Sequence, residues 1–288
     1  MTVYILLAIL FTTSLFIILK YFEKWHVNNI QGLTFNYFTA ALFAFSIGLN
    51  KNIQHLNTIK SFYKISLIVG ILFIIVFYLT TLTAQKNGVS VATIASKMSV
   101  VIPALSGVLL YAEPFNFLKL AGLTLALFSV YLTGRAKQET NEAKHTLLLP
   151  VLVFLGCGIV DTSLKYTQTT FFTNENSQLF AGSFYGCAGL CGLLILVYKF
   201  FFLKQTLELK SVVAGILLGL CNYPSLHFLF LALKYPGADS GKIFTIINVG
   251  IVICSVLVSK FLFEEKIRFA KFAGIIIAIC AIIILYFA

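Results

Sequence analysis

Residues 84–122 read AQKNGVSVATIASKMSVVIPALSGVLLYAEPFNFLKLAG, and this stretch decides how the rest of the chain is interpreted. From Val91 to Tyr111 it contains 21 residues with one charged side chain, Lys97. A helix needs about 20 mostly apolar residues to cross the hydrocarbon core of a bilayer. The stretch therefore predicts a membrane-spanning helix, which Pro103 should perturb near its middle.

The composition of the whole chain agrees with a membrane protein. Of its 288 residues, 59% are hydrophobic and 11% are charged, and the mean hydropathy is +0.96. Soluble domains carry about 25% charged residues, so an ordinary soluble globule is excluded. The net charge is +11, but the basic residues lie singly or in small groups between apolar runs. They can contact lipid phosphates there, so we expect membrane lipid as a partner and no nucleic acid.

Nine further apolar runs flank the one in the opening stretch, and the links between them are short and hydrophilic. The first run lacks a basic leader and a small-residue cleavage site, which favours a retained span over a signal peptide. The fold class predicted is an all-α integral membrane protein with ten transmembrane helices. The runs are 2–19, 33–49, 65–83, 91–111, 117–133, 147–166, 179–203, 212–233, 243–263 and 269–288.

The chain also contains an internal repeat. Residues 1–134 form a first five-helix repeat, 135–146 a hydrophilic linker and 147–288 a second five-helix repeat. The offset between matching residues is 145 at first, then 148, then 152. In chain order the main matches are Lys20 with Lys165, Gly70 with Gly215, Tyr78 with Tyr223, Ala84 with Ala232, Lys86 with Lys234, Glu113 with Glu265, Lys119 with Lys271 and Gly122 with Gly274.

Each repeat has an odd number of spans, so the second must enter the membrane with the opposite orientation to the first. Such inverted repeats let a transporter keep one site near the midplane and open it alternately to either side. Two inverted five-helix repeats are therefore predicted.

The opening stretch combines a small residue entering the span, the mid-span Pro103, Glu113 closing the helix, and Gly122 in the next span. This pattern resembles the signature of EamA-type carriers in the drug/metabolite transporter superfamily. The second half repeats it from 232 to 274 but departs at the proline, because Ser255 stands opposite Pro103.

The resemblance implies a multi-pass protein of the cytoplasmic (inner) membrane that moves a small organic solute by secondary active transport. An amino-acid-like or drug-like metabolite is expected, and the oligomeric state is left open. The alternative is a non-transporting membrane protein such as a channel, receptor or scaffold. Enzyme motifs such as HExxH, GxSxG and the P-loop are absent from the sequence, so we expect no enzyme, cofactor or metal.

The orientation of the termini is open. Thirteen Lys and Arg residues fall in links on the side opposite the termini and seven on the terminal side. The positive-inside rule then favours external termini. The family resemblance implies cytoplasmic ones.

Lys97 is the first candidate for solute binding, together with its neighbour Ser96. An ammonium inside a span costs about 3 kcal/mol on insertion scales, so it is expected to serve a partner such as a solute carboxylate or phosphate. Asp161 on a neighbouring span is a second possible partner. The alternative is that the long stem carries the charge to the lipid headgroups.

Further candidates lie in the third, eighth and ninth runs. Polar groups inside spans tend to face a cavity or one another. A proline within the eighth run is expected to kink that helix and release a backbone carbonyl. Packing inside the helix bundle is the alternative for each side chain. The candidates for solute binding here are Tyr78, Asn222, Tyr223, His227 and Asn248.

Asp161, Lys165 and His227 are the candidates for proton coupling. Asp161 is the only acid well inside an apolar run, and Lys165 follows at the spacing that places both on one helical face. The alternative is a self-neutralising pair near the end of the sixth run.

Three other features are interpreted as structural. The six cysteines lie in apolar runs and are expected to be small buried hydrophobes. The small residues from Ala181 to Gly192 predict a helix-helix seam. Glu113 and Glu265, at helix ends, are expected to hold short turns.

Overall fold

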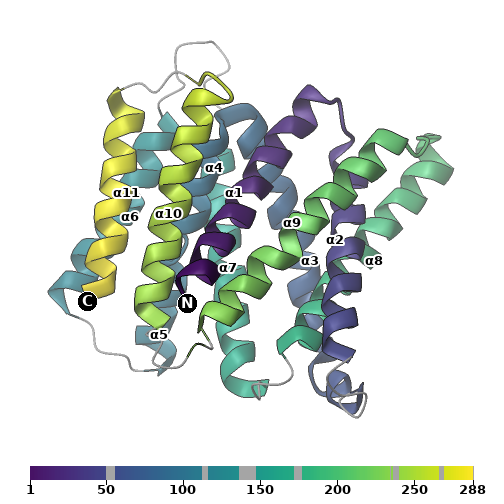
Figure 1. Ribbon diagram of the computed structural model, residues 1–288, viewed down its shortest axis with the longest axis horizontal. Coiled ribbons are helices and arrows are strands. Elements are labelled where there is room, and N and C mark those ends of the chain that lie inside the picture. The colour runs from purple at the N-terminus through teal and green to yellow at the C-terminus, as the bar shows by residue number, and fades with distance from the viewer. Residues whose placement is uncertain are drawn as a thin grey trace. The chain divides into compact units, whose positions relative to one another are not determined.

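The computed structural model describes residues 1–49, 56–111, 116–135, 147–171, 177–233, 235, 240–265 and 269–287. In these residues every regular element is a helix, and short links join the helices (Figure 1). The helices are α1 (Thr2–Lys24), α2 (Asn29–Leu49), α3 (Leu56–Asn87), α4 (Val89–Met98), α5 (Val101–Tyr111), α6 (Phe117–Arg135), α7 (Leu148–Phe171), α8 (Ser177–Leu203), α9 (Leu209–Leu233), α10 (Ser240–Phe261) and α11 (Phe269–Phe287).

Seven helical segments in the described ranges are long and apolar enough to cross a membrane. Three shorter apolar helices, at Phe117–Thr133, Leu148–Leu164 and Ile246–Phe261, occupy the places of the remaining predicted runs. The fold is thus that of an all-helical, multi-pass membrane protein. That all ten segments cross the bilayer stays a prediction.

The fourth apolar run is not one continuous helix but two, α4 and α5, interrupted at Ser99 and Val100. Pro103 has no N–H, so it cannot donate the usual bond to the carbonyl of Ser99 four residues earlier. Ile102 N donates to Ser99 O instead, at 2.9 Å, and the Ser99 hydroxyl donates to Ser96 O at 2.5 Å. The perturbation predicted at Pro103 is therefore a break in the helix.

The chain divides into two compact units, and each draws on both halves of the sequence. Unit 1 comprises Met1–Lys20, Leu79–Ile159 and Ser225–Ala288, and unit 2 comprises Tyr21–Tyr78 and Val160–Pro224. Helices α1, α3, α7 and α9 therefore contribute to both units. Each compact unit is therefore formed by matching helices from the two halves of the sequence, and not by one half alone.

The core of unit 1 is built on the contact between α6 and α11, which lie side by side in Figure 1. The two helices are antiparallel, because Gly122 near the start of α6 lies against Leu285, and Gly274 near the start of α11 lies against Thr133. The α4 residues Ile94 and Met98 complete this apolar core. Glycine permits the close approach, since lipid supplies little hydrophobic drive between helices.

In unit 2 the helix α2 packs against α8 on one side. Gly182, Gly189 and Gly192 of α8 meet Phe45, Phe38 and Thr34 of α2 in turn, so these helices are also antiparallel. The predicted seam of small residues is confirmed.

A second seam joins α2 to α9 in unit 2. Gly215 lies against the backbone oxygen of Gly32, and Gly219 lies against the backbone oxygen of Asn36. These glycines are one helical turn apart and face the same neighbour, so α2 and α9 run parallel at close range. This pattern of two glycines four residues apart is typical of tight helix pairs in membranes.

The expectation of buried cysteines was wrong. All six are free thiols, but five are only partly buried and Cys280 of α11 is exposed. A membrane helix presents an apolar outer face to lipid. An apolar position therefore need not be covered by protein.

Candidate functional site

A network of neutral polar side chains lies inside unit 2, where α2, α8 and α9 meet. The amide Nδ2 of Asn222 donates to Asn36 Oδ1 at 3.1 Å, and the hydroxyl of Tyr185 donates to Asn222 Oδ1 at 3.3 Å. All three residues are buried, with exposed fractions of 4% or less. The Gly219 contact brings α9 close enough to α2 for Asn222, three residues later, to reach Asn36.

The network contains a donor without a partner. Asn36 Nδ2 is buried and makes no hydrogen bond with the described residues. A buried polar group that lacks a partner raises the energy of the fold by about 1 to 3 kcal/mol. Such a donor can hold a carbonyl, carboxylate or phosphate oxygen that enters the unit.

Aromatic rings surround this network. Tyr37 donates its hydroxyl to Phe73 O at 2.9 Å, and its ring lies 6.1 Å from that of Tyr185. Tyr223 is 3% exposed and stacks on Phe43, with ring centroids 6.4 Å apart. Its repeat counterpart Tyr78 is half-buried in α3.

Lys97 lies in unit 1, in the last turn of α4, two residues before the break at Ser99. Its side chain is half-buried, as is that of Ser96. Ser96 Oγ accepts a long contact of 3.5 Å from the thiol of Cys157 on α7. Because the break gives α4 a C-terminus of its own, the helix dipole favours a cation at this position. A short helix ending inside an apolar run thus offers a place for a charge.

His227 and Asn248 also belong to unit 1, on α9 and α10, and both side chains are half-buried. The His227 ring lies 5.8 Å from that of Phe228 in an edge-to-face arrangement, and Phe228 stacks on Phe11 of α1 at 5.6 Å. These contacts place His227 beside the aromatic junction of α1 and α9.

Asp161 and Lys165 lie on α7 within unit 2. The side chain of Asp161 is exposed, and that of Lys165 lies outside the described residues. Proton coupling through this pair stays a prediction.

The candidates chosen from the sequence fall into two groups. Tyr78, Asp161, Lys165, Asn222 and Tyr223 belong to unit 2, and Ser96, Lys97, His227 and Asn248 belong to unit 1. Of these candidates, Asn222 is the one placed in the neutral network of the described side chains.

Two members of the neutral network were missed among the site residues chosen from the sequence. Neither Tyr185 nor Asn36 was chosen. A signal existed, because Asn36 follows Gly32 and Asn222 follows Gly219 within one turn.

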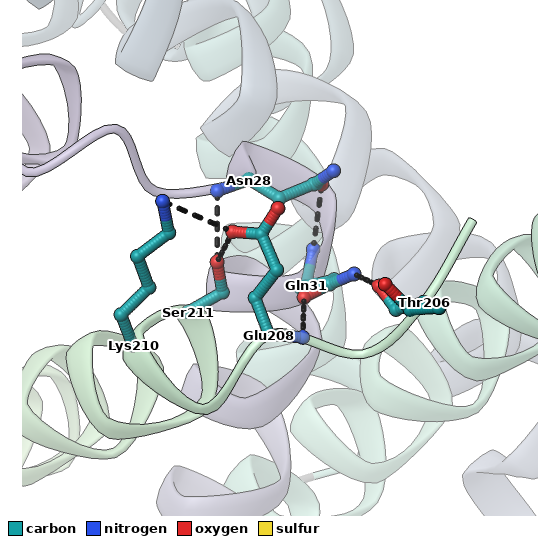
Figure 2. Close-up of polar contacts among 6 residues, drawn as sticks. All are labelled: Asn28, Gln31, Thr206, Glu208, Lys210 and Ser211. Carbon is teal, nitrogen blue, oxygen red and sulfur yellow. Dashed lines mark hydrogen bonds and ion pairs between the residues drawn. The ribbon is translucent and has the colours of Figure 1, made fainter.

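At one end of unit 2, hydrogen bonds connect the α1–α2 link and the start of α2 to the α8–α9 link and the start of α9 (Figure 2). We call this group of contacts the polar clasp. The side chain of Gln31 donates to Thr206 O at 2.8 Å and accepts from Glu208 N at 2.9 Å, so its amide pairs with the backbone of the link. Asn28 N donates to Ser211 Oγ at 2.9 Å. The clasp satisfies backbone groups at the starts of α2 and α9, and is structural.

Glu208 supplies the charged part of this clasp. Its carboxylate accepts from the hydroxyl of Ser211 at 3.2 Å and lies 3.5 Å from Lys210 Nζ. The ion pair is well exposed, so it adds little to stability. Within the described ranges no group of three or more His, Cys, Asp or Glu side chains could hold a metal ion.

Comparison with known proteins adds to this geometry. Residues 1–135 match the model of the EamA-like transporter family. The match covers slightly less than half of the chain. The match agrees with the resemblance carried by Pro103, Glu113 and Gly122, and the matched family is one of transporters.

The likeness to individual proteins extends over both halves. An uncharacterized protein of Haemophilus influenzae is 23% identical over 290 residues, which cover 98% of this chain and 97% of the relative. A protein known from a crystal structure is similar in fold, with a TM-score of 0.59 and 12% identity, and 96% of each chain is covered. At that identity the likeness speaks for the fold alone.

Proposed function

We propose that this EamA-like protein is a secondary active transporter that moves a small organic solute across the cytoplasmic membrane by alternating access. The observation that carries the proposal is the position of Lys97, a half-buried cation at a break between two short helices. Discontinuous helices commonly border the binding sites of transporters, because their ends can hold charged groups. The family match of residues 1–135 supports the same conclusion.

Inverted repeats are a common basis for alternating access, and the packing of unit 1 supports that relation between the two halves. Gly122 lies against Leu285, and Gly274 lies against Thr133. The offset of 152 that pairs Gly122 with Gly274 also pairs Thr133 with Leu285. Exchanging the halves therefore converts each contact into the other, as expected of a pseudo-twofold axis.

The packing of unit 2 supports the repeat independently. Gly48 lies against Leu179, and Gly192 lies against Thr34. Leu179 is the counterpart of Thr34 at an offset of 145, and Gly192 lies one residue from the counterpart of Gly48. The same exchange therefore relates these two contacts within one residue.

The solute in this proposal carries an anionic group for Lys97 and further oxygens for neutral donors. Solute binding is assigned to Lys97, Ser96, Tyr78, Tyr223, Asn222, His227 and Asn248. Asp161, Lys165 and His227 are assigned to proton coupling.

The first test is a ligand-stabilisation screen of the purified protein. A solute that binds the folded state raises the melting temperature of the protein. At a concentration 100 times its Kd, the solute adds about 2.7 kcal/mol to the free energy of unfolding. We expect stabilisation by a carboxylated or phosphorylated metabolite. No shift across amino acids, nucleosides, sugars, organic phosphates and cationic drugs would count against a carrier.

Uptake into proteoliposomes then separates a carrier from the alternatives. A carrier saturates and exchanges labelled solute for unlabelled solute across the membrane. A channel passes solute without saturating, and a receptor or scaffold gives no uptake.

A further inference from the structure

The short helix α4, which carries Ser96 and Lys97, is capped by residues from outside its own segment. Gly88 occupies its N-cap position with a φ of 102° and offers no side chain to the first free N–H groups. Val89 N donates to Glu265 Oε1 at 3.1 Å, and Ser90 N donates to Ser259 Oγ at 3.1 Å. Two N–H groups that a helix normally leaves open are thus satisfied from the end of α10 and the link that follows it.

The cap is built around a shielded charge. The other carboxylate oxygen of Glu265, Oε2, pairs with Lys271 Nζ on α11 at 2.9 Å, and the two side chains are 15% and 7% exposed. Glu265 N donates to Ser259 O at 2.9 Å, which fixes both capping residues relative to each other. A side chain at position 88 would collide with the Glu265 carboxylate, so glycine is required there.

The two ends of α4 differ in how they are held. The N-terminal end is fixed by Glu265 and Ser259, whereas the C-terminal end stops at the break beside Ser99. Lys97 is eight residues from Val89, about 12 Å along the helix. A change at the capped end can therefore shift the lysine through a single short helix.

We propose that Glu265 is a positioning residue, which caps α4 from the α10–α11 link and so sets the place of Lys97. This inference rests on the proposed function only in giving Lys97 a role in solute binding. It goes beyond the expectation that Glu265 merely holds its own turn. The Glu265 carboxylate pairs with Lys271 of α11 and also accepts from Val89 of α4, which is 176 residues away from Glu265 in the sequence.

The cap is tested by hydrogen exchange on the full-length protein in lipid nanodiscs, with Cys157 as a second reporter. In Glu265→Ala we expect amide exchange in residues 86–95 to become about tenfold faster. We also expect N-ethylmaleimide to modify Cys157, which touches Ser96, about tenfold faster, as resolved by peptide mass spectrometry. Exchange in α6 and modification of Cys280 should stay within twofold of wild type.

Three further variants separate positioning from general stability. Glu264→Gln changes the neighbouring exposed carboxylate and should match wild type. Glu265→Gln keeps an acceptor oxygen for Val89 N and should restore most of the protection. Ser259→Ala removes only the acceptor for Ser90 N, so it should accelerate exchange about threefold, and it provides the test if Glu265→Ala does not fold.

Two results would overturn the proposal. One is unchanged exchange in residues 86–95 in both Glu265→Ala and Ser259→Ala. The other is an equal acceleration in α6, which would make Glu265 a general stabilising residue. Neither depends on transport, so failure of the solute-binding role of Lys97 would be recognised separately by the uptake assay.

Discussion

Unit 1 contains charged groups at helix ends that are at least half-buried, whereas unit 2 contains a buried network of neutral side chains within helices. Lys97 sits at the end of α4, and Glu265 with Lys271 sits at its start. Asn36, Asn222 and Tyr185 instead bond to one another from the middle of three packed helices.

The difference shows where a membrane protein can place charge. Helix ends supply open N–H and C=O groups and a dipole, which compensate an ion that would otherwise be costly. The interior of a continuous helix offers no such groups, so side chains there must satisfy one another. On this view a charge suits a helix end, as at Lys97 in unit 1, and neutral hydrogen bonds suit the interior of continuous helices, as at Asn222 in unit 2.

The largest effect should come from Lys97. Lys97→Ala is expected to insert and fold but to abolish saturable uptake in proteoliposomes, because Lys97 is the one charged side chain of α4. Lys97→Arg keeps the charge with a different geometry and should be partly active. Wild-type uptake by the alanine variant would show that Lys97 faces lipid and does not bind the solute.

The antiparallel packing of α6 and α11 in unit 1 predicts that the starts of these two helices lie on opposite sides of the membrane. Phe117 and Phe269 are related by the offset of 152, begin α6 and α11, and are strongly exposed. Cysteines at these positions should react with a membrane-impermeant maleimide from opposite sides of the membrane. For this assay the natural cysteines are replaced and each variant is labelled in right-side-out and inverted vesicles. Labelling of both from one side would contradict the inverted repeat.

Glycine substitutions compare the seams of the two units. In Gly215→Ala the new methyl group meets the backbone oxygen of Gly32, which cannot move aside, so we expect a loss of about 3 kcal/mol in unfolding free energy. In Gly122→Ala it meets chiefly the side-chain end of Leu285, which can change rotamer, so the loss should be about 1 kcal/mol.

Gly186→Ala is the matched control for these variants, because its methyl group makes only an ordinary contact with Phe45 at 3.9 Å. It should leave stability unchanged or raise it slightly, since alanine favours helix over glycine. Thermal unfolding in one detergent measures all three. Equal losses of unfolding free energy for Gly215→Ala and Gly122→Ala would contradict the expectation that a backbone contact tolerates the added methyl group less well than a side-chain contact does.

The last prediction concerns the neutral network of unit 2. Asn222→Leu should destabilise the protein by about 2 kcal/mol, since it leaves the Asn36 amide and the Tyr185 hydroxyl without their partner. Adding Asn36→Leu to Asn222→Leu should lower the unfolding free energy by less than Asn36→Leu does in the wild-type protein. The difference, which is the coupling energy of the double-mutant cycle, should be about 1 kcal/mol. Strict additivity would show that the two amides do not share a network.

The sequence alone determined the helices and the family resemblance, because both depend on local properties. Bilayer thickness sets the length of an apolar run, so the helix ends lie within a few residues of prediction, apart from α3, which begins nine residues earlier, and from the break in the fourth run. Even that break has a local cause in the missing N–H of Pro103.

Only the tertiary structure decided which polar groups meet. Asn36 and Asn222 are 186 residues apart, and Glu265 and Val89 are 176 apart, so no spacing in the sequence connects them. Glycines at 215 and 219 admit a close neighbour, but the sequence does not say that this neighbour is α2. A polar residue in an apolar run signals that a partner exists, and packing between distant helices determines which partner it is.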